Sequence, residues 1–163
     1  MLHAPAGARL AKITRDPDLG ILAARLLFSV QREVFARLAE RGHGDVRPQH
    51  GAILAYLDAD GVRATELARL SGRHKQIVGR LVDELEALGY VERRPDPADR
   101  RAKLVVPTER GLDEQRHADE IIAEIERRHA ATLGEPTYAQ LRHALMKITD
   151  PAGMPGADDA AED

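Results

Sequence analysis

Residues 73–80 read Arg-His-Lys-Gln-Ile-Val-Gly-Arg, and the predicted elements are arranged around this segment. It holds three Lys or Arg side chains, no acidic side chain, and a glycine where the apolar spacing predicts a helix interior. That helix is predicted over residues 74–88. A shorter helix is predicted directly before it, over residues 66–70 with Thr65 as its cap, and Ser71-Gly72 ends it. Two short helices joined by a tight glycine turn form a helix-turn-helix.

The second of these helices has a polar face at its N-terminal end. We expect Val78, Leu81 and Leu85 to face the core. The outward residues are then Lys75, Gln76, Gly79 and Arg80. This end of such a helix enters a major groove, where Gln suits adenine and Lys or Arg suits guanine. Gly79 costs about 1 kcal/mol relative to Ala in a helix interior, which indicates either close approach to DNA or close helix packing. An ordinary solvated helix face is the alternative interpretation of the charges.

A basic hairpin follows the helix. The pattern predicts a strand over residues 90–94, a loop over 95–99 and a returning strand over 102–106, with pairing ending at the prolines of the loop. Five basic side chains lie on this hairpin: Arg93, Arg94, Arg100, Arg101 and Lys103. Arginine at a loop tip can enter a minor groove, and Asp99 is placed to pair with Arg101 and hold the tip. The alternative is an exposed hairpin whose charges serve solubility.

The remaining apolar spacing predicts four more helices. The first runs over residues 18–42 with Asp16 or Asp18 as its cap, and the second runs from Pro48 to about residue 60. The fifth begins after Thr108 and ends at Gly134, and the sixth spans residues 136–148. Residues 1–17 are predicted to be a flexible segment. Residues 150–163 are predicted to be a disordered acidic tail, with five acidic and no basic side chains.

Composition excludes several classes of protein. The chain of 163 residues has no cysteine, which excludes thiol redox sensing, disulfides and cysteine-based metal sites. Its seven histidines include no pair at helical i, i+4 spacing, so we predict no metal site. No catalytic triad, carboxylate pair or phosphate loop is legible, which predicts that the protein is not an enzyme. Since no apolar run approaches the roughly 20 residues that span a bilayer and no signal peptide is legible, we expect a cytoplasmic protein without a membrane partner.

Four segments resemble the MarR family of bacterial winged-helix transcription regulators. They are Leu-Val-Asp-Glu-Leu-Glu at 81–86, Leu-Gly-Tyr-Val-Glu-Arg at 88–93, Asp-Pro-Ala-Asp-Arg-Arg-Ala at 96–102 and Thr-Glu-Arg-Gly at 108–111. The resemblance covers about residues 18–148, and the segment at 96–102 is its most specific part. It implies a homodimer joined by its terminal helices, with each recognition helix in a major groove of a palindromic operator and each wing in the adjacent minor groove. It also implies repression of nearby genes, relieved when a small aromatic or phenolic ligand binds between the dimer region and the DNA-binding lobe.

These observations predict a mainly α fold with a small β-hairpin wing, in which a winged helix-turn-helix is flanked by terminal dimerisation helices. The domain spans residues 18–149, with its winged-helix lobe at about 62–107 and its dimerisation helices at about 18–42 and 108–149. The predicted function is a sequence-specific regulator of double-stranded DNA, a homodimeric and ligand-responsive repressor without a cofactor. The alternative is a winged-helix module that binds another protein and hardly touches DNA.

The predicted site residues fall into four groups. The recognition helix contributes His74, Lys75, Gln76, Gly79 and Arg80, although many members of the family have Ser or Thr where this chain has His74. The flanking phosphate contacts are Thr65, Arg69 and Arg73. The wing contributes Arg93, Arg94, Asp99, Arg100, Arg101 and Lys103. The residues predicted to line a ligand pocket are Arg25, Phe28, His50 and Tyr56.

Overall fold

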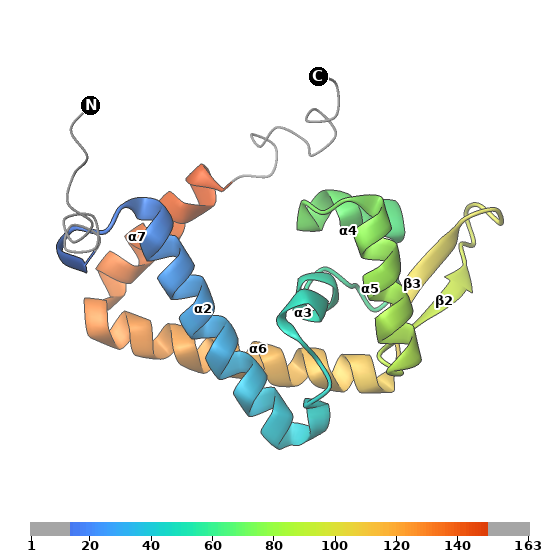
Figure 1. Cartoon of the computed structure of the whole chain (residues 1–163), viewed down its shortest axis with the longest axis horizontal. Helices are drawn as coiled ribbons and strands as arrows, with labels where there is room; N and C mark the ends of the chain where they lie inside the picture. The colour runs from blue at the N-terminus through green and yellow to red at the C-terminus, as the bar shows by residue number, and fades with distance from the viewer. Residues whose placement is uncertain (1–13, 150–163) are drawn as a thin grey trace, which may run out of the picture.

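The computed structural model describes residues 14–149, and Figure 1 shows the arrangement of its helices and strands. In chain order the elements are α2 (Leu19–Leu38), the π-helical turn η1 (Ala39–His43), α3 (Pro48–Leu54), β1 (Val62–Arg63), α4 (Ala64–Ser71), α5 (Lys75–Ala87), β2 (Val91–Pro95), β3 (Lys103–Pro107), α6 (Glu109–Leu133) and α7 (Glu135–Ile148). The predicted fold class is confirmed. The predicted flexible start, apart from its last four residues, and the predicted acidic tail lie outside the described residues. Within residues 14–149, every helix is too short or too polar to cross a lipid bilayer.

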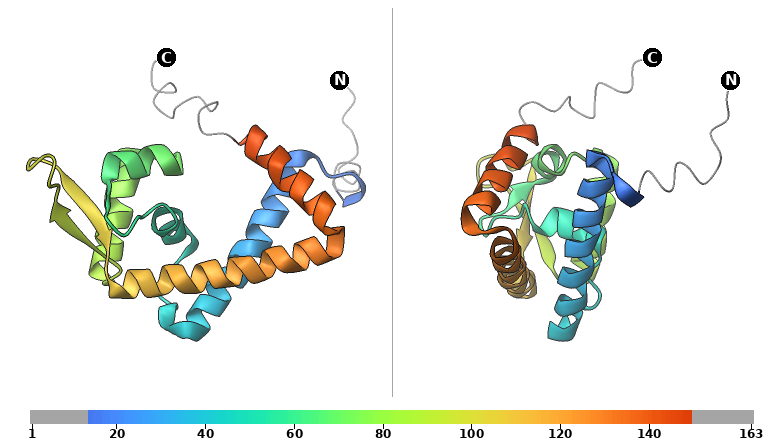
Figure 2. Two further views of the ribbon diagram at one scale, coloured as in Figure 1. Left: turned by 180° about the vertical axis from the view of Figure 1, so that it is seen from behind. Right: turned by 90° about the vertical axis from the view of Figure 1, so that its left-hand side faces the viewer.

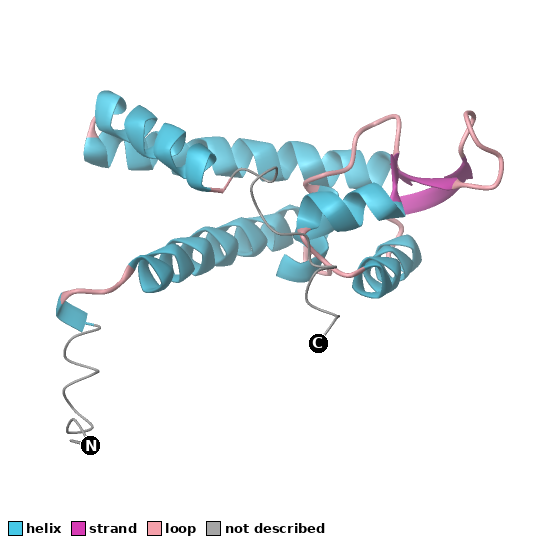
Figure 3. Cartoon of the chain, turned by 90° about the horizontal axis from the view of Figure 1, so that it is seen from above, coloured by secondary structure: helices cyan, strands magenta, loops and turns pink. Residues whose placement is uncertain are grey.

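The chain forms two parts that are joined along α6. We name them the winged-helix lobe, which consists of α3, α4, α5 and the three strands, and the stem, which consists of α2, α6 and α7. In Figure 1, α6 runs from the lobe along the stem, α2 crosses it, and β2 and β3 extend away from the lobe at the end opposite α7. The view from behind in Figure 2 shows the same arrangement, with the lobe at one end of α6 and α7 at the other. Figure 3 shows from above that β2 and β3 lie at one end of the molecule, whereas the stem is purely helical.

The strands form one antiparallel sheet in the order β1-β3-β2. The predicted hairpin is confirmed, and its ladder runs from the pair Val91 and Pro107 to the pair Pro95 and Lys103, where the proline ends it. Each hairpin strand begins one residue later than predicted. Val62 pairs with Val105 and adds a third strand to the sheet, which the predicted hairpin did not include.

The helix starts follow the predicted caps with one exception. Asp18 accepts the backbone N–H of Ile21 at 3.0 Å at the start of α2, and Thr108 accepts that of Gly111 at 3.2 Å at the start of α6. The prediction that Thr65 caps α4 was wrong, because the helix begins at Ala64 after Arg63. Arg63 is held in an extended conformation by its pairing in β1, so the helix starts directly after the strand.

The prediction that α3 extends to about residue 60 was also wrong, since the helix ends at Leu54. The Gln115 side-chain amide of α6 donates to the Leu54 carbonyl at 2.7 Å and to the Leu57 carbonyl at 3.0 Å. A distant side chain therefore satisfies backbone acceptors that the end of a helix leaves without partners. Leu57 remains buried although it lies outside the helix.

The apolar interior consists of two clusters. The larger one lies in the lobe and contains Val46, Ile53, Leu54, Leu57, Leu67, Ala68, Val78, Leu81, Val82, Leu85, Tyr90, Val91 and Val105. The smaller one joins α2 to α6 and contains Val34, Leu38, Ile121 and Ile125. Phe35 packs against both clusters. Its ring lies so close to α3 that a Cβ at Gly51 would meet Phe35 Cζ at 2.8 Å, so a larger residue there would force the ring to shift.

Candidate nucleic-acid interface

The helix-turn-helix consists of α4 and α5 joined by a glycine turn. Gly72 has φ 63°, in the left-handed region that favours glycine, and it ends α4. The buried side of α5 consists of Val78, Leu81, Val82 and Leu85. Lys75, Gln76 and Arg80 are exposed, so the predicted polar face of the recognition helix has the predicted orientation. His74 precedes the helix as its cap residue and makes no side-chain capping bond.

Gly79 lies on the same side as this polar face. A Cβ built at Gly79 would meet no atom within 4 Å among the described residues outside the local backbone of α5. Close packing against another helix of the described chain therefore does not explain the glycine. Of the two reasons that the sequence left open, close approach of a partner such as DNA remains.

Several basic side chains around this face form ion pairs within the chain. Arg69 pairs with Glu66 at 2.6 Å. Arg93 pairs with Asp83 at 2.5 Å and also with Glu86, so it ties β2 to α5. The other two pairs are Arg80 with Glu84 and Arg94 with Glu92. Exposed pairs of this kind contribute about 0–1 kcal/mol, so phosphate can replace the carboxylates at little cost.

A second group of cations is free to meet an external anion. Over residues 14–149, these side chains form no ion pair: Arg73, Lys75, Arg100, Arg101 and Lys103. The group combines the start of the recognition helix with the wing. The remaining flank residue, Thr65, is exposed in the first turn of α4.

The wing loop is held by two aspartates. Asp96 is buried and accepts the Ala98 backbone N–H at 2.8 Å and the Arg63 Nε–H at 2.7 Å. These two bonds, in that order of size, lower the pKa of the Asp96 carboxyl. The predicted pairing of the Asp99 and Arg101 side chains was wrong, because Asp99 instead accepts the backbone N–H of Arg101 at 3.1 Å. The sequence interpretation missed Arg63 and Asp96, although Asp before Pro in a predicted hairpin loop is a turn signal.

His50 joins α3 to the recognition helix. Its Nδ1 accepts the Arg47 backbone N–H at 3.2 Å, so the proton of the neutral ring lies on Nε2 and is donated to Glu84 at 2.8 Å. This bond is the largest cause of a lowered pKa of the Glu84 carboxyl. Gln49 donates to the same carboxylate at 3.2 Å. His50 therefore fixes the position of α5, and it does not line the cavities of about 590 Å³ and 540 Å³ in residues 14–149.

A buried network connects the lobe to α6. The Tyr90 hydroxyl donates to Asp45 Oδ1 at 2.6 Å and lies 3.1 Å from His43 Nδ1. His43 Nε2 lies 3.0 Å from Asp113 Oδ2. Burial and then the bond to Asp45 raise the pKa of the Tyr90 hydroxyl, whereas the bond from His43 lowers that of the Asp113 carboxyl. The guanidinium of Arg110 lies 4.3 Å above the centre of the Tyr90 ring.

His43, Asp113 and His117 form a cluster that the sequence did not predict. One ligand atom from each lies within 4.8 Å of the others, a spacing that a divalent ion can bridge. The Arg41 guanidinium, however, lies 3.0 Å from His117 Nδ1 and adds a positive charge that opposes such an ion. The predicted lack of a metal site stays a prediction.

A cavity of about 590 Å³ lies between the stem and the lobe. Its wall is mainly apolar and includes Leu27, Val30, Val34, Phe35, Leu54, Ala55, Tyr56, Leu57 and Ile122. The end of α4 contributes Ser71, the turn before α5 contributes Arg73, and α6 contributes Glu114, Gln115 and Asp119. Of the four residues predicted to line a pocket, Tyr56 lies in this wall, whereas Arg25, Phe28 and His50 do not.

Glu114 is the buried acid of this cavity wall, and the sequence interpretation missed it. It is only 2 % exposed, and its Oε2 has no hydrogen-bond partner among the described residues. Burial and the nearby Asp119 raise the pKa of the Glu114 carboxyl to about 7. Nothing in the sequence marks this glutamate among the many acids of α6, because its burial depends on the packing of α6 against the lobe.

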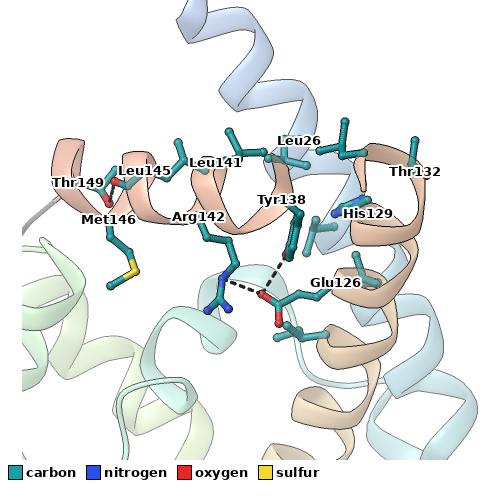
Figure 4. A pocket seen from close by; sticks show the side chains of 14 residues that line it. Leu26, Glu126, His129, Thr132, Tyr138, Leu141, Arg142, Leu145, Met146 and Thr149 are labelled. Carbon is teal, nitrogen blue, oxygen red and sulfur yellow. Dashed lines mark hydrogen bonds and ion pairs between the residues drawn. The ribbon is translucent and has the colours of Figure 1, made fainter. Parts of the chain in front are cut away.

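A second cavity, of about 540 Å³, lies among α2, α6 and α7 (Figure 4). Glu126 in its wall accepts from the Tyr138 hydroxyl at 3.2 Å and pairs with Arg142 Nε at 3.5 Å. The large apolar side chains that α2 and α7 leave exposed are Leu19, Leu22, Leu26, Leu27, Phe28, Leu141, Leu145, Met146 and Ile148. Large exposed apolar patches mark surfaces that bind a partner.

Comparisons with known proteins agree with this geometry. The sequence model of the MarR family matches residues 45–102. None of the curated proteins compared matches the chain. CouR from Rhodococcus jostii RHA1, solved with p-coumaroyl-CoA, has 28 % identity and a TM-score of 0.70, over 88 % of this chain and 98 % of that one.

Two other solved structures extend the comparison. A MarR-family transcriptional regulator from Rhodococcus sp. RHA1 has 28 % identity and a TM-score of 0.68, over 84 % of this chain and 97 % of that one. The transcriptional regulator Tm0710 from Thermotoga maritima has 30 % identity and a TM-score of 0.51, over 78 % and 88 %. The chain, with its helix-turn-helix, wing and helical stem, belongs to the MarR family of transcriptional regulators.

Proposed function

We propose that the protein is a homodimeric transcription repressor that binds a palindromic site in double-stranded DNA and releases it when a small molecule binds. The observation that carries this proposal is the distribution of free cations. Lys75 on α5 and Arg101 on the wing are exposed and form no ion pair within the described chain. Both α5 and the wing strands contribute to the core of the lobe, and in our proposal their free cations together contact the phosphates of a duplex.

The side chains of this surface divide into two roles. Lys75 and Gln76 lie at the exposed start of α5, where side chains reach base edges in a major groove. Arg80 has the same role in our proposal, and it exchanges its bond to Glu84 for a base contact. Phosphate contacts are assigned to Arg73 and the wing arginines. At Arg69 and Arg93, phosphate has to replace an internal carboxylate.

The stem supplies the dimer contact in this proposal. In a dimer, the exposed leucines of α2 and α7 pack against those of the second copy. This packing removes the side chains from water and fills the cavity of Figure 4. A two-fold axis through this contact places two recognition helices on one face, which requires a palindromic site.

The cavity between stem and lobe is the site proposed for the effector. CouR, which shares the fold, was solved with p-coumaroyl-CoA. In this chain, Ser71 and Arg73 line the cavity directly before α5, so a bound molecule contacts the segment that positions the recognition helix. We expect an effector with an aromatic ring, because the wall is apolar and contains Phe35 and Tyr56. The proposal includes no catalytic role or cofactor, and it places the protein with the DNA in the cytoplasm.

Selection of duplexes from a random pool, followed by sequencing, tests this function. A recovered palindrome supports DNA binding and dimer geometry together. The affinity for that duplex is expected to fall steeply as salt rises, because bound phosphates release counterions. If no duplex binds at low salt, the module that binds another protein becomes the better interpretation.

Two substitutions separate the roles of the surface. Arg80→Ala is expected to relax the base preference of the selected site, whereas Arg101→Ala weakens binding to all duplexes and lowers the salt slope by about one. Arg127→Ala is the matched control, since Arg127 is exposed toward the α7 end of α6 and forms no ion pair within residues 14–149. Operator binding that neither Arg80→Ala nor Arg101→Ala alters would refute this assignment.

A further inference from the structure

The cavity between stem and lobe contains a carboxyl group that the folded chain leaves without a hydrogen-bond partner. Glu114 Oε2 is buried in the wall of this cavity, and no described residue donates to it. The side-chain amide of the next residue, Gln115, already donates to two backbone carbonyls, those of Leu54 and Leu57. Since burying a polar atom without a partner is unfavourable, a ligand that donates a hydrogen bond to Glu114 relieves this cost.

The charges around Glu114 select the kind of donor. A second acid, Asp119, lies in the same wall, and its charge acts on the Glu114 carboxyl. Arg73 is the cation of the wall, and it comes from the turn before α5. Tyr90 also lies near enough to Glu114 for its hydroxyl to respond to the glutamate charge. The side of the cavity formed by α6 therefore attracts a positive group and repels an anion.

The rest of the wall suits the apolar body of such a ligand. Leu27, Val30 and Leu54 supply aliphatic surface. The rings of Phe35 and Tyr56 belong to the same wall and can contact a cation through their π faces. A cavity of about 590 Å³ falls in the range of small-molecule sites.

We propose that the effector of this cavity is an apolar, aromatic primary amine whose ammonium group donates a hydrogen bond to Glu114. The inference rests on the proposed function, because it names the chemical class of the effector. The bound ammonium holds Glu114 as a carboxylate. Because burial raises the pKa of the Glu114 carboxyl to about 7 in the free protein, some of these side chains carry a proton at pH 7, and binding of the ammonium releases that proton to the solvent.

The test compares three probes of the same size by titration calorimetry: 2-phenylethylamine, 2-phenylethanol and phenylacetate. The amine is expected to bind at least tenfold more tightly than the alcohol and the carboxylate. Titrations at pH 7 in two buffers of different ionisation enthalpy measure the released proton. Glu114→Gln should abolish proton release and weaken amine binding by about tenfold or more, because it removes a charge-assisted bond.

Glu109→Gln is the matched control, because Glu109 is exposed on the same helix and lies outside the cavity wall. It should retain amine binding and proton release. Equal binding of the three probes, tightest binding of phenylacetate, or an amine preference that survives Glu114→Gln would overturn the inference.

Duplex binding without a probe separates this inference from the proposed function. A protein that binds its selected duplex but shows no amine preference contradicts the inference alone. A protein that prefers the amine but binds no duplex contradicts the proposed function. If both hold, 2-phenylethylamine is expected to lower duplex affinity in the wild type and to lose this effect in Glu114→Gln.

Discussion

Gly79 offers a test in which stability and DNA binding change in opposite directions. It occupies an interior position of α5, where glycine costs about 1 kcal/mol relative to alanine. A Cβ at this position meets nothing within 4 Å in the described chain outside the local helix backbone. Gly79→Ala is therefore expected to raise the free energy of unfolding by about 1 kcal/mol. If the glycine exists to let DNA approach α5, the added methyl group should also weaken duplex binding.

The size of the binding loss follows from the cost of a methyl group in a packed contact. Overpacking costs about 1–3 kcal/mol, which corresponds to a loss of duplex affinity of about fivefold to 150-fold. Urea unfolding followed by circular dichroism measures the first effect, at one protein concentration because a dimer unfolds in a concentration-dependent way. Fluorescence anisotropy of a labelled duplex at fixed salt measures the second.

Gly51→Ala is the control, since its Cβ would meet Phe35 Cζ at 2.8 Å. This variant should lose stability by about 1–3 kcal/mol, although it has the same change of side chain in a helix. Unchanged duplex affinity in Gly79→Ala would refute the close approach of DNA. A loss of stability in Gly79→Ala would instead show that the face of α5 is packed in the folded protein.

Three further predictions concern buried polar groups. Tyr90→Phe should lower the free energy of unfolding by about 1–3 kcal/mol, because Asp45 and His43 each lose their contact with the Tyr90 hydroxyl. Urea unfolding measures this effect, and an unchanged midpoint would contradict the network. Asp96→Asn should weaken duplex binding several-fold with little change in thermal stability, since the wing loop loses the charge that holds it. A variant with the same duplex affinity as the wild type would argue against a role of the shape of this loop. Folding raises the pKa of the Glu114 carboxyl from 4.5 to about 7, so the contribution of this group to stability falls as pH rises through this window. The free energy of unfolding of Glu114→Gln should therefore exceed that of the wild type by up to about 3 kcal/mol at pH 8 and by much less at pH 4. Urea unfolding of both proteins at the two pH values measures this difference in stability. If the pKa of Glu114 were not raised by folding, the difference would be the same at both pH values.

The sequence predicted the recognition helix and the hairpin closely, because both depend on local signals. The spacing of Val78, Leu81 and Leu85 determined which face of α5 is exposed, and the proline at 95 marked the end of strand pairing. The ion pair of Arg80 with Glu84 joins residues at helical i, i+4 spacing, although the sequence interpretation did not predict it.

The parts that the sequence did not predict depend on contacts between distant residues. The early end of α3 follows from Gln115, which lies 61 positions after Leu54. The strand β1 is too short for a period of two to be recognised, and its pairing with β3 establishes it. The burial of Glu114 depends on the docking of α6 against the lobe, as does the meeting of His43 with Asp113. Local patterns in a sequence contain no record of such contacts.

The presence of two apolar clusters has a consequence for how the protein opens. A structure whose interior is divided is expected to unfold in separate cooperative units, each with its own amide exchange rate. The amides of α4, α5 and β3 belong to the cluster of the lobe, whereas the middle of α2 and α6 belongs to the other one. Phe35, as a shared member, is the residue through which loosening of one unit reaches the other. Truncation of this ring should therefore increase the difference between the amide exchange rates of the two units. The Phe35 ring thus couples the opening of the lobe to the opening of the stem.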